Sequence, residues 1–593
     1  MKLRLLSIPS LVETVRRFPL PLACGAAAFF VLPDLRYGFL TSHSKDPALS
    51  SLSAILFVGV FFHTAFALIP ARTRRARALF AAAGVAVHLA YGVWVFALPN
   101  TAVAWPVAFG VAIGLLLIAV LPFLRSRDDL SFWQFNRTVW QGVGIALAAG
   151  LLLAGGVSIG MKGLDQLFGI DLSRPYYRDV WTFVFYLVVP LHALSFVPKN
   201  THFPAQDCRM PGPLSAIVNG IMAPLALAYM LILYAYFIKI GFSGELPNGV
   251  LAHLVTGFGG FGMVTYLVGW PLREAGGGPL RLFYKIFLPA MAVPVALQAA
   301  AIYQRVDAFG LTENRVAIIV ATLWFALVLA ARLFGRLRLK AIPALLALLL
   351  ALVAAGPFSA YRLTILDQTN RMDTILARHG MLAGDRIVPA AAELPAEDRY
   401  KLGSIVTFLV KRGATEDMMR RLRLDTGRPY AHEIIRAMGF VSVSKWSLQN
   451  PITQSNLKVG KLPNVISTEG YDILFQSRSF KIDGKPDKNL SLDWKSPSAM
   501  QAAYADGKIT YTVAGMGQVT LDVFTALAAA APKEEKDRVR VLFVEGENDH
   551  FRVRAYLSAN LWKWVHREKP GEFADLRLQR VSFVTLFAKK DSP

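Results

Sequence analysis

Charged residues are scarce in this sequence. Asp, Glu, Lys and Arg make up 17% of its 593 residues, against about 25% in soluble globular proteins. The deficit falls on residues 1–360, which hold 28 Lys and Arg and 13 Asp and Glu, whereas residues 361–593 hold 35 and 27. This composition excludes a soluble domain over residues 1–360 and predicts a membrane-embedded one, followed by a region of ordinary soluble composition.

Cysteine and catalytic motifs are also scarce. Cys24 and Cys208 are the two cysteines, so no disulfide framework is possible in residues 361–593, and we expect both to be small packing residues. Residues 361–593 contain no Gly-x-Ser-x-Gly elbow, and the zinc-protease pattern that begins at His432 and Glu433 lacks its second histidine because position 436 is Arg. We therefore predict no catalytic residue, no cofactor and no metal ligand.

Long apolar runs are plentiful. A helix that crosses a bilayer needs about 20 mainly apolar residues, and eleven segments are candidates, of which the first, sixth, tenth and eleventh are short. The fold class that we expect is a polytopic α-helical membrane protein with about 11 transmembrane helices and a C-terminal α+β soluble domain. The eleven segments are 18–33, 52–70, 78–98, 103–124, 138–160, 180–197, 214–238, 250–270, 286–303, 316–331 and 341–357.

Lys and Arg alternate between the two sides of these segments. With the N-terminus placed in the cytoplasm, the inner loops hold 20 basic residues and the outer loops hold 8, which follows the positive-inside rule. Eleven spans then place residues 361–593 in the periplasm of a protein of the bacterial inner membrane. We expect the inner loops to bind anionic lipid headgroups. We expect no nucleic-acid binding, because the basic residues are scattered over many loops.

Ionisable side chains are rare inside the predicted spans. Buried acids and bases usually mark ion or proton pathways, so their rarity argues against a proton-coupled pump. Asp34 lies at the outer end of the first span. The remaining polar candidates are four histidines, which we interpret as hydrogen-bonded packing residues: His63, His88, His192 and His253.

Small residues and helix breakers have a regular placement. One small residue per turn runs along the fifth span, which predicts close packing against a neighbouring helix; the residues are Gly142, Ala146, Gly150, Ala154 and Ser158. Helix breakers interrupt the sixth to ninth spans, where they indicate kinks or, alternatively, the substrate site of a transporter. These breakers are Pro190, Pro224, Gly257, Gly259, Gly260, Gly262, Pro289 and Pro294.

Residues 361–593 divide into two predicted parts. Residues 361–440 have helical periodicity and form a helical neck, and residues 441–593 form a mainly antiparallel α+β extracytoplasmic domain. Within it we expect strands at 471–476, 508–513 and 576–587, a hairpin around 546–549, and helices near 519–531 and 559–565. A partner of this domain would be an envelope protein, a lipid or a polysaccharide.

Several stretches resemble an uncharacterised bacterial integral membrane family, domain of unknown function 4153. They are FWQFNR at 132–137, LILYAY at 231–236, FGLTENR at 309–315 and GPFS at 356–359, followed by the helix around 368–376. The resemblance covers most of the membrane part and the neck. It implies the architecture and carries over no reaction, substrate or catalytic residue. Within FGLTENR, residues 312–314 suit a cap at the start of the tenth span.

Three classes of function remain open. The first is a non-enzymatic envelope sensor, scaffold or regulator. The second is a transporter or lipid flippase that uses the kinked spans six to nine, and the third is a membrane-embedded transferase that acts on a lipid-linked substrate. A transferase needs an acidic residue in an outer loop. The candidates are Asp34, Asp46, Asp165, Asp171, Asp179, Glu245, Asp307 and Glu313. Our candidate functional residues are Asp34, Asp165, His192, His253, Gly257, Gly259, Gly260, Pro289 and Pro294.

Overall fold

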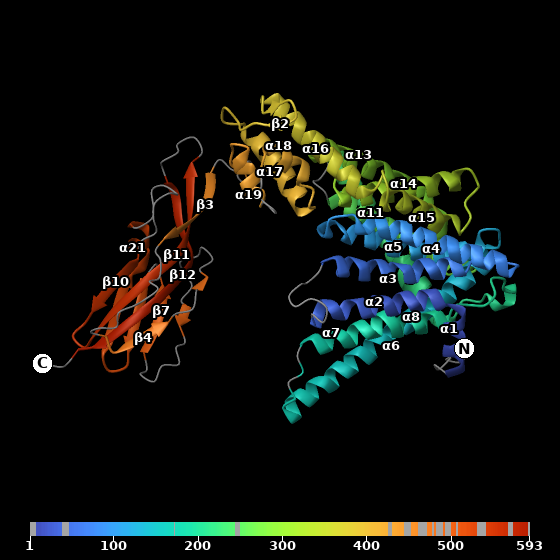
Figure 1. Ribbon diagram of the computed structural model, residues 1–593, viewed down its shortest axis with the longest axis horizontal. Coiled ribbons are helices and arrows are strands. Elements are labelled where there is room, and N and C mark those ends of the chain that lie inside the picture. Colours follow the sequence, from blue (N-terminus) through green and yellow to red (C-terminus); the bar gives the residue numbers. More distant parts are fainter. Residues whose placement is uncertain are drawn as a thin grey trace. The chain divides into compact units, whose positions relative to one another are not determined.

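A computed structural model describes most of the chain (Figure 1). The chain divides into two compact units, the first of Met1–Leu394 with Lys401–Val441 and the second of Pro395–Tyr400 with Ser442–Pro593. The described residues are 8–37, 47–170, 172, 174–243, 250–424, 430–443, 452–459, 471–476, 480–481, 490–492, 500–505, 508–529, 541–566 and 573–590.

The first unit begins with a bundle of long apolar helices. A shared aromatic and aliphatic core holds them together, in which Phe135, Phe258, Phe287 and Phe325 are almost fully buried. The helices are α1 (Ile8–Arg17), α2 (Pro19–Tyr37), α3 (Pro47–Ala67), α4 (Arg74–Phe96), α5 (Ala104–Val120), α6 (Asp129–Phe168), α7 (Arg174–Phe183), α8 (Val189–Ser195), α9 (Gly212–Ile217), α10 (Ala223–Ser243), α11 (Val250–Gly269), α12 (Gly278–Ala290), α13 (Ala292–Phe309), α14 (Glu313–Leu333) and α15 (Ala341–Ala354).

All eleven predicted spans contain helix, but the count of 11 is not confirmed. Among the described residues, eight helical stretches are long and apolar enough to cross a membrane. The segments that fall short are those of α2, of α7 with α8, and of α15. Because α15 has 14 residues, it is about 21 Å long at 1.5 Å per residue, less than the roughly 30 Å of a hydrocarbon core.

Three of the four proline- or glycine-rich spans are interrupted. π-helical turns at Val184–Val188 and Val218–Met222 precede Pro190 and Pro224, and the α12–α13 junction at Met291 lies between Pro289 and Pro294. A proline has no N–H to donate and displaces the carbonyl four residues earlier. By contrast, α11 continues through its glycines as a regular helix.

Close packing of α6 against α7 and α8 confirms the prediction for its small residues. A Cβ on Gly142 would lie 2.2 Å from Cβ of Phe196, and one on Gly150 would lie 2.4 Å from Cγ2 of Val189. Trp181 donates a 3.1 Å hydrogen bond from Nε1 to Oγ of Ser158. The small side chains therefore let the neighbouring backbone approach α6.

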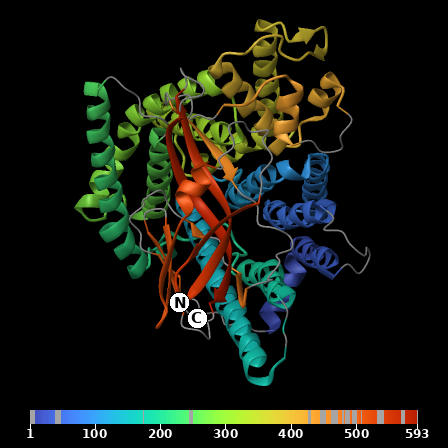
Figure 2. The same ribbon diagram turned by 90° about the vertical axis from the view of Figure 1, so that its left-hand side faces the viewer.

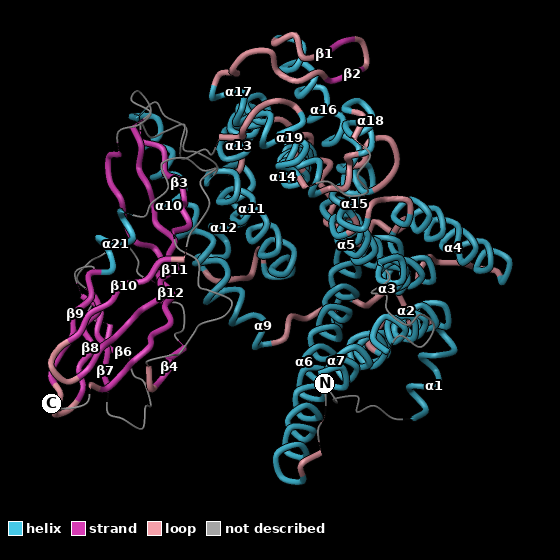
Figure 3. Tube along the Cα trace, turned by 60° about the vertical axis from the view of Figure 1, so that its left-hand side comes forward, coloured by secondary structure: helices cyan, strands magenta, loops and turns pink. Residues whose placement is uncertain are grey.

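The long α6 and the short α15 begin beside each other. The N–H of Leu339, just before α15, donates to Oδ1 of Asp129, the first residue of α6, at 3.3 Å. Lys340 Nζ donates to the carbonyl oxygens of Phe123 and Ser126, at 2.7 and 2.6 Å. From this common level, α6 extends beyond the helices around it (Figures 1 and 3).

Among the described residues, α16, α18, α19, a small hairpin and α17 from Lys401 onward complete the first unit. Ser359 caps α16, since its Oγ accepts the N–H of Arg362. Leu376, Leu402 and Ile434 are fully buried in a separate apolar core. The elements are α16 (Ala360–Arg378), β1 (Leu382–Ala383), β2 (Arg386–Ile387), α17 (Ala396–Lys411), α18 (Glu416–Leu422) and α19 (Ala431–Ala437).

The second unit is built mainly from two antiparallel sheets (Figure 2). One has the order β10-β11-β12-β4, with β3 paired to β11 and β5 to β12; the other has the order β6-β7-β8-β9. Tyr511 and Thr585 join the sheets through a buried 2.9 Å hydrogen bond. The strands are β3 (Ile452–Val459), β4 (Ile473–Gln476), β5 (Phe480–Lys481), β6 (Leu490–Leu492), β7 (Met500–Ala505), β8 (Lys508–Val513), β9 (Gly517–Asp522), β10 (Leu542–Glu547), β11 (Phe551–His566) and β12 (Phe573–Lys589), with helix α21 (Val523–Ala529) between β9 and β10.

The strand predictions for this unit agree with the structure better than the helix predictions. The predicted strand at 508–513 is β8, and the predicted hairpin joins β10 to β11. The predicted helix near 559–565 is wrong, because this stretch belongs to β11 and pairs with β12 and β3. The predicted helix near 519–531 begins later, at Val523, after β9.

Candidate functional site

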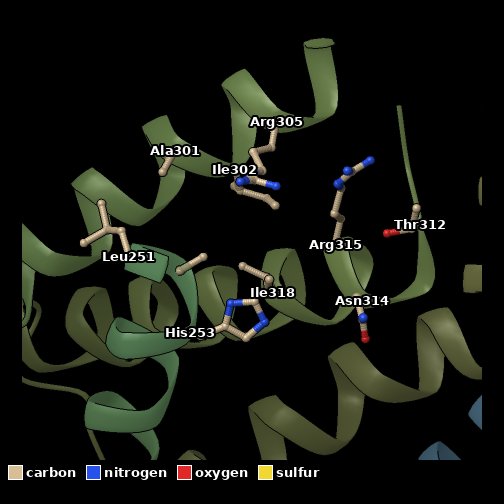
Figure 4. Close-up of a pocket in the computed structure, with 10 residues that line it drawn as sticks. Leu251, His253, Ala301, Ile302, Arg305, Thr312, Asn314, Arg315 and Ile318 are labelled. Carbon is tan, nitrogen blue, oxygen red and sulfur yellow. The ribbon is translucent and has the colours of Figure 1, made fainter. Parts of the chain in front are cut away.

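A pocket with a basic lining lies where α11, α13 and α14 meet (Figure 4). Its volume is 190 Å³. Arg305 from α13 and His253 from α11 approach it from opposite sides, while Ile302 and Ile318 provide apolar surface. The complete lining is Leu251, Ala252, His253, Ala301, Ile302, Arg305, Thr312, Asn314, Arg315 and Ile318.

The turn between α13 and α14 shapes one side of this pocket. It is the segment 309–312, and its conformation depends on Gly310, which has φ +72° and ψ −176°. A side chain is disfavoured at this positive φ. A Cβ there would also lie 2.4 Å from Oδ2 of Asp367 and 2.5 Å from Nε2 of Gln368. Thr312 occupies the N-cap position of α14 as predicted, but its side chain makes no capping hydrogen bond.

Arg315 connects the pocket to this turn. Its side chain contributes to the pocket lining, and its Nη1 donates hydrogen bonds to the carbonyl oxygens of Phe309, at 3.0 Å, and of Gly310. A guanidinium group has five N–H donors in a fixed plane, so one side chain can hold the turn and face the pocket together. Any change in the position of Arg315 would therefore act on the turn.

The neck helix α16 binds the other side of the same turn. Asp367 Oδ2 accepts the N–H of Leu311 at 2.7 Å. Gln368 Nε2 donates to the carbonyl oxygens of Phe309 and Leu311, at 3.1 and 2.9 Å. Arg371, which pairs with Asp367, donates to the end of α13 at the carbonyl oxygens of Val306 and Asp307, both at 2.8 Å. The Phe309 carbonyl thus accepts from both Arg315 and Gln368.

A buried ion pair joins the start of α14 to the end of α17. Glu313 is 3% exposed, and its Oε1 lies 2.7 Å from Nε of Arg412. Nη2 of Arg412 also donates to Oε2 at 3.2 Å. Burial, together with the charges of Glu313 and Glu416, raises the pKa of Tyr361 in α16. The FGLTENR segment therefore anchors two helices of the neck.

The structure does not gather the candidate residues into one site. His253 lines the pocket, whereas His192 is buried in α8 beside Phe196, with ring centroids 5.3 Å apart. Asp165 forms an ion pair with Lys162 one helical turn away in α6. Asp34 belongs to α2, and its side chain falls outside the described part of the chain.

The glycine and proline candidates occupy packing and junction positions. A Cβ on Gly259 would lie 2.4 Å from the Phe325 ring, whereas Gly257 and Gly260 have open space. Pro289 is exposed and Pro294 is buried, on either side of the α12–α13 junction. Of these three glycines only Gly259 supplies close packing, and none of them breaks α11, which continues as a regular helix.

Sequence reasoning missed Arg305, Arg315 and their connection to α16. The signal was present in FGLTENR, which places a glycine, a cap position and an arginine together at a helix start. The connection to Asp367 and Gln368 spans more than fifty residues, so no local pattern could reveal it. Glu433, in the broken zinc-protease pattern, accepts the N–H of Tyr430 at 2.8 Å and so caps α19.

These features define the class of the protein and its family. In the part of the chain that the structure describes, eight apolar helical stretches of spanning length identify a polytopic membrane protein. A family model described as "Domain of unknown function (DUF4153)" matches residues 25–386, and the chain belongs to this family. The match confirms the resemblance and includes the basic pocket, its turn and α16.

One curated relative and the solved structures complete the comparison. An uncharacterised protein of Pasteurella multocida (strain Pm70) is 28% identical over 278 residues, which is 45% of this chain and 46% of that protein. The chain thus matches about half the length of this relative. No solved structure matches the chain.

Proposed function

We propose that this protein is a non-enzymatic sensor or regulator of the bacterial envelope that binds an anionic group in the basic pocket. The observation that carries the proposal is the Phe309 carbonyl, which accepts hydrogen bonds from Arg315 at the pocket and from Gln368 in α16. A ligand that moves Arg315 would change the turn on which α16 is held. Binding would thereby be relayed to the neck.

The pocket chemistry supports a small anion. Two guanidinium groups bind phosphate or carboxylate oxygens well, and Thr312, Asn314 and His253 offer further polar atoms. A volume of 190 Å³ accommodates one such group and excludes a whole lipid. The ligand that fits is a phosphate group, either free or at the head of a lipid whose acyl chains remain outside.

The predicted orientation supports this role. The alternation of basic residues predicts that this end of α13 and α14 faces the periplasm. The neck, residues 361–440, and the domain of residues 441–593 would then transmit the signal to an envelope protein, lipid or polysaccharide. Basic loops on the opposite face would bind anionic headgroups and fix this orientation.

A thermal-shift experiment tests the proposal. We expect inorganic phosphate, or short-chain phosphatidic acid, to raise the Tm of the purified full chain, since a ligand at 100 times its Kd stabilises by about 2.7 kcal/mol. Arg305→Gln should abolish the shift. Arg336→Gln is the matched control, because Arg336 is exposed beyond the opposite end of α14.

Two measurements test separately whether the pocket binds an anion and whether binding is transmitted to α16. An unchanged Tm with both anions, or an equal shift in Arg305→Gln, contradicts anion binding at this pocket. Hydrogen exchange then tests the relay: the ligand should change exchange in residues 360–378 of the wild type. If the anion raises Tm but leaves exchange in residues 360–378 unchanged, the pocket binds the anion and the sensing role is refuted.

A transporter is the second candidate function. The interruptions at Val184–Val188, Val218–Met222 and Met291 support it, because transporters often build substrate sites at broken helices. Uptake of phosphate by proteoliposomes that contain the full chain would favour this alternative over sensing.

A further inference from the structure

Three side chains that can bind metal converge between α2, α3 and α4. Cys24, His63 and His88 each offer one ligand atom, and these atoms all lie within 4.8 Å of one another. Nε2 of His63 and Nδ1 of His88 are 3.1 Å apart. Both histidines are buried, at 6% and 7% exposure. Sequence reasoning treated the three separately, as packing residues.

We propose that Cys24, His63 and His88 bind one soft monovalent metal ion, Cu(I). A thiolate and two imidazoles are the ligands that copper favours among protein side chains. Two ligand nitrogens on one metal at about 2.0 Å are separated by slightly more than 3 Å, close to the observed separation. The site requires a small movement of the Cys24 side chain and loss of its thiol proton to solvent.

His88 is already oriented as a ligand. Its Nε2 lies 2.9 Å from the carbonyl oxygen of Ile55. Since a carbonyl can only accept, Nε2 carries the proton, and Nδ1 directs a lone pair toward His63. Metal-binding histidines usually donate their second N–H to such an acceptor, which fixes the ring and its tautomer. Without metal, His63 satisfies this lone pair through its own Nε2–H.

Close helix packing fixes the position of the ligands. A Cβ on Gly59 of α3 would lie 2.3 Å from Cε1 of His88, so the ring rests directly on the α3 backbone. Next to Cys24, a Cβ on Gly25 would lie 2.5 Å from the carbonyl oxygen of Tyr186. Gly59 therefore brings α4 close to α3 at the two histidines, and Gly25 brings the turn before α8 close to α2 beside Cys24.

Charge balance selects Cu(I) over a divalent ion. Residues 19–33 and 47–96 contain no Asp or Glu, so the thiolate is the one anionic ligand that these segments provide. Cu(I) with one thiolate and two neutral imidazoles is neutral, whereas Zn(II) would leave one uncompensated positive charge. Burial of such a charge away from water is costly.

A cavity gives access to this cluster. His63 lines a cavity of 580 Å³ that also borders Arg16, Arg17, Arg77 and Lys199. Arg17 donates to the carbonyl oxygens of Val197 and Pro198, both at 2.6 Å, which fixes its charge there. Such a basic lining disfavours entry of a bare divalent cation and tolerates Cu(I) delivered in an anionic thiolate complex.

Competition with a chromophoric Cu(I) chelator tests the proposal on the purified full chain in detergent. We expect one Cu(I) per chain in the wild type, and Cys24→Ser should lower the affinity by more than about 100-fold, because even outer-shell changes cost 10- to 100-fold. Cys208→Ser is the matched control and should retain binding. His88→Gln should lose binding and His192→Gln should keep it.

X-ray absorption of the copper-loaded wild type provides a measurement that does not depend on folding of the variants. It should show one sulfur and two nitrogen ligands. The proposal is overturned if the wild type binds no more Cu(I) than Cys24→Ser, or if the spectrum lacks the sulfur. Equal affinity for Zn(II) would overturn the selection of a monovalent ion.

Discussion

At the scale of single residues, the Glu313–Arg412 pair is the contact whose loss should matter most. Its carboxylate is 3% exposed and its partner comes from a segment 99 positions away in sequence. Removal of one partner of a buried pair leaves an uncompensated charge, which costs about 3–5 kcal/mol. The net attraction between the two charges is small, but the free-energy cost of leaving one of them unpaired is large. This cost holds the neck to α14.

We expect Arg412→Ala to destabilise the first unit strongly, with α17 and α18 losing protection from hydrogen exchange. Glu313→Gln combined with Arg412→Ala should be less destabilised than Arg412→Ala alone, because no buried charge remains. The measurement is the Tm of each variant in detergent, together with exchange of residues 401–422. Equal losses in the single and double variants would show that packing, rather than charge, holds the junction.

Residue-level predictions from the sequence succeeded where the reason was local. The cap position of Thr312, for example, follows from neighbouring residues. Contacts across long sequence separations, such as Arg315 through Phe309 to Gln368, could not be predicted. The proximity of His63 and His88 falls in the same group, because it depends on how α3 packs against α4.

At the scale of elements, α6 offers a matched pair of glycines. A Cβ on Gly142 would meet Cβ of Phe196 at 2.2 Å, whereas one on Gly144 would meet nothing within 4 Å. We expect Gly142→Ala to lower Tm, since Phe196 and α8 must shift. Gly144→Ala should leave Tm unchanged or raise it slightly, because Ala is favoured over Gly in a helix by about 1 kcal/mol. Equal Tm values for the two variants would contradict the close α6–α8 contact.

Helices were easier to predict than their interruptions or the strand at 559–565. Apolar length located a helix in each of the eleven predicted segments but missed α1, and α11 shows that glycines in a helix need not break it. The error at β11 has a tertiary cause. Ala559 to Val565 are paired on both sides, with β12 and β3, and these non-local hydrogen bonds override the local helical preference.

At the scale of the whole molecule, orientation in the membrane is the property to measure. We expect a periplasm-active reporter fused after Pro593 to be active and a cytoplasm-active reporter at the same site to be silent. The expectation follows from the 20 to 8 distribution of basic residues and an odd number of spans. The reverse result would mean an even number and would move the proposed anion pocket to the opposite face.

Reporters after residues 98 and 170 serve as internal controls, because they follow helices of spanning length, α4 and α6. Two spanning helices, α5 and α6, separate the two sites, so both reporters should indicate the periplasm if α2 crosses the membrane and the cytoplasm if it does not. If both indicate the periplasm and the reporter after Pro593 does not, the miscount lies after residue 170, at α7 with α8 or at α15. Composition was sufficient to predict a polytopic membrane protein and a strand-rich C-terminal region. It could not give the span count, since short apolar helices satisfy the same hydropathy with too little length.

The unequal lengths of α6 and α15 have a consequence for the surrounding lipid. Both helices start at one level, joined by Asp129 and Leu339, yet α6 has 40 residues and α15 has 14. At 1.5 Å per residue they reach about 60 Å and about 21 Å. Leu167 and Phe168, at the far end of α6, are 80% and 71% exposed. The uncharged part of α6, residues 138–161, is about 36 Å long, close to the thickness of a hydrocarbon core. Beside α6 the lipid therefore needs little adjustment, whereas beside the short α15 the bilayer must thin. Such a protein would favour membranes that deform easily, and acyl-chain length would control its stability.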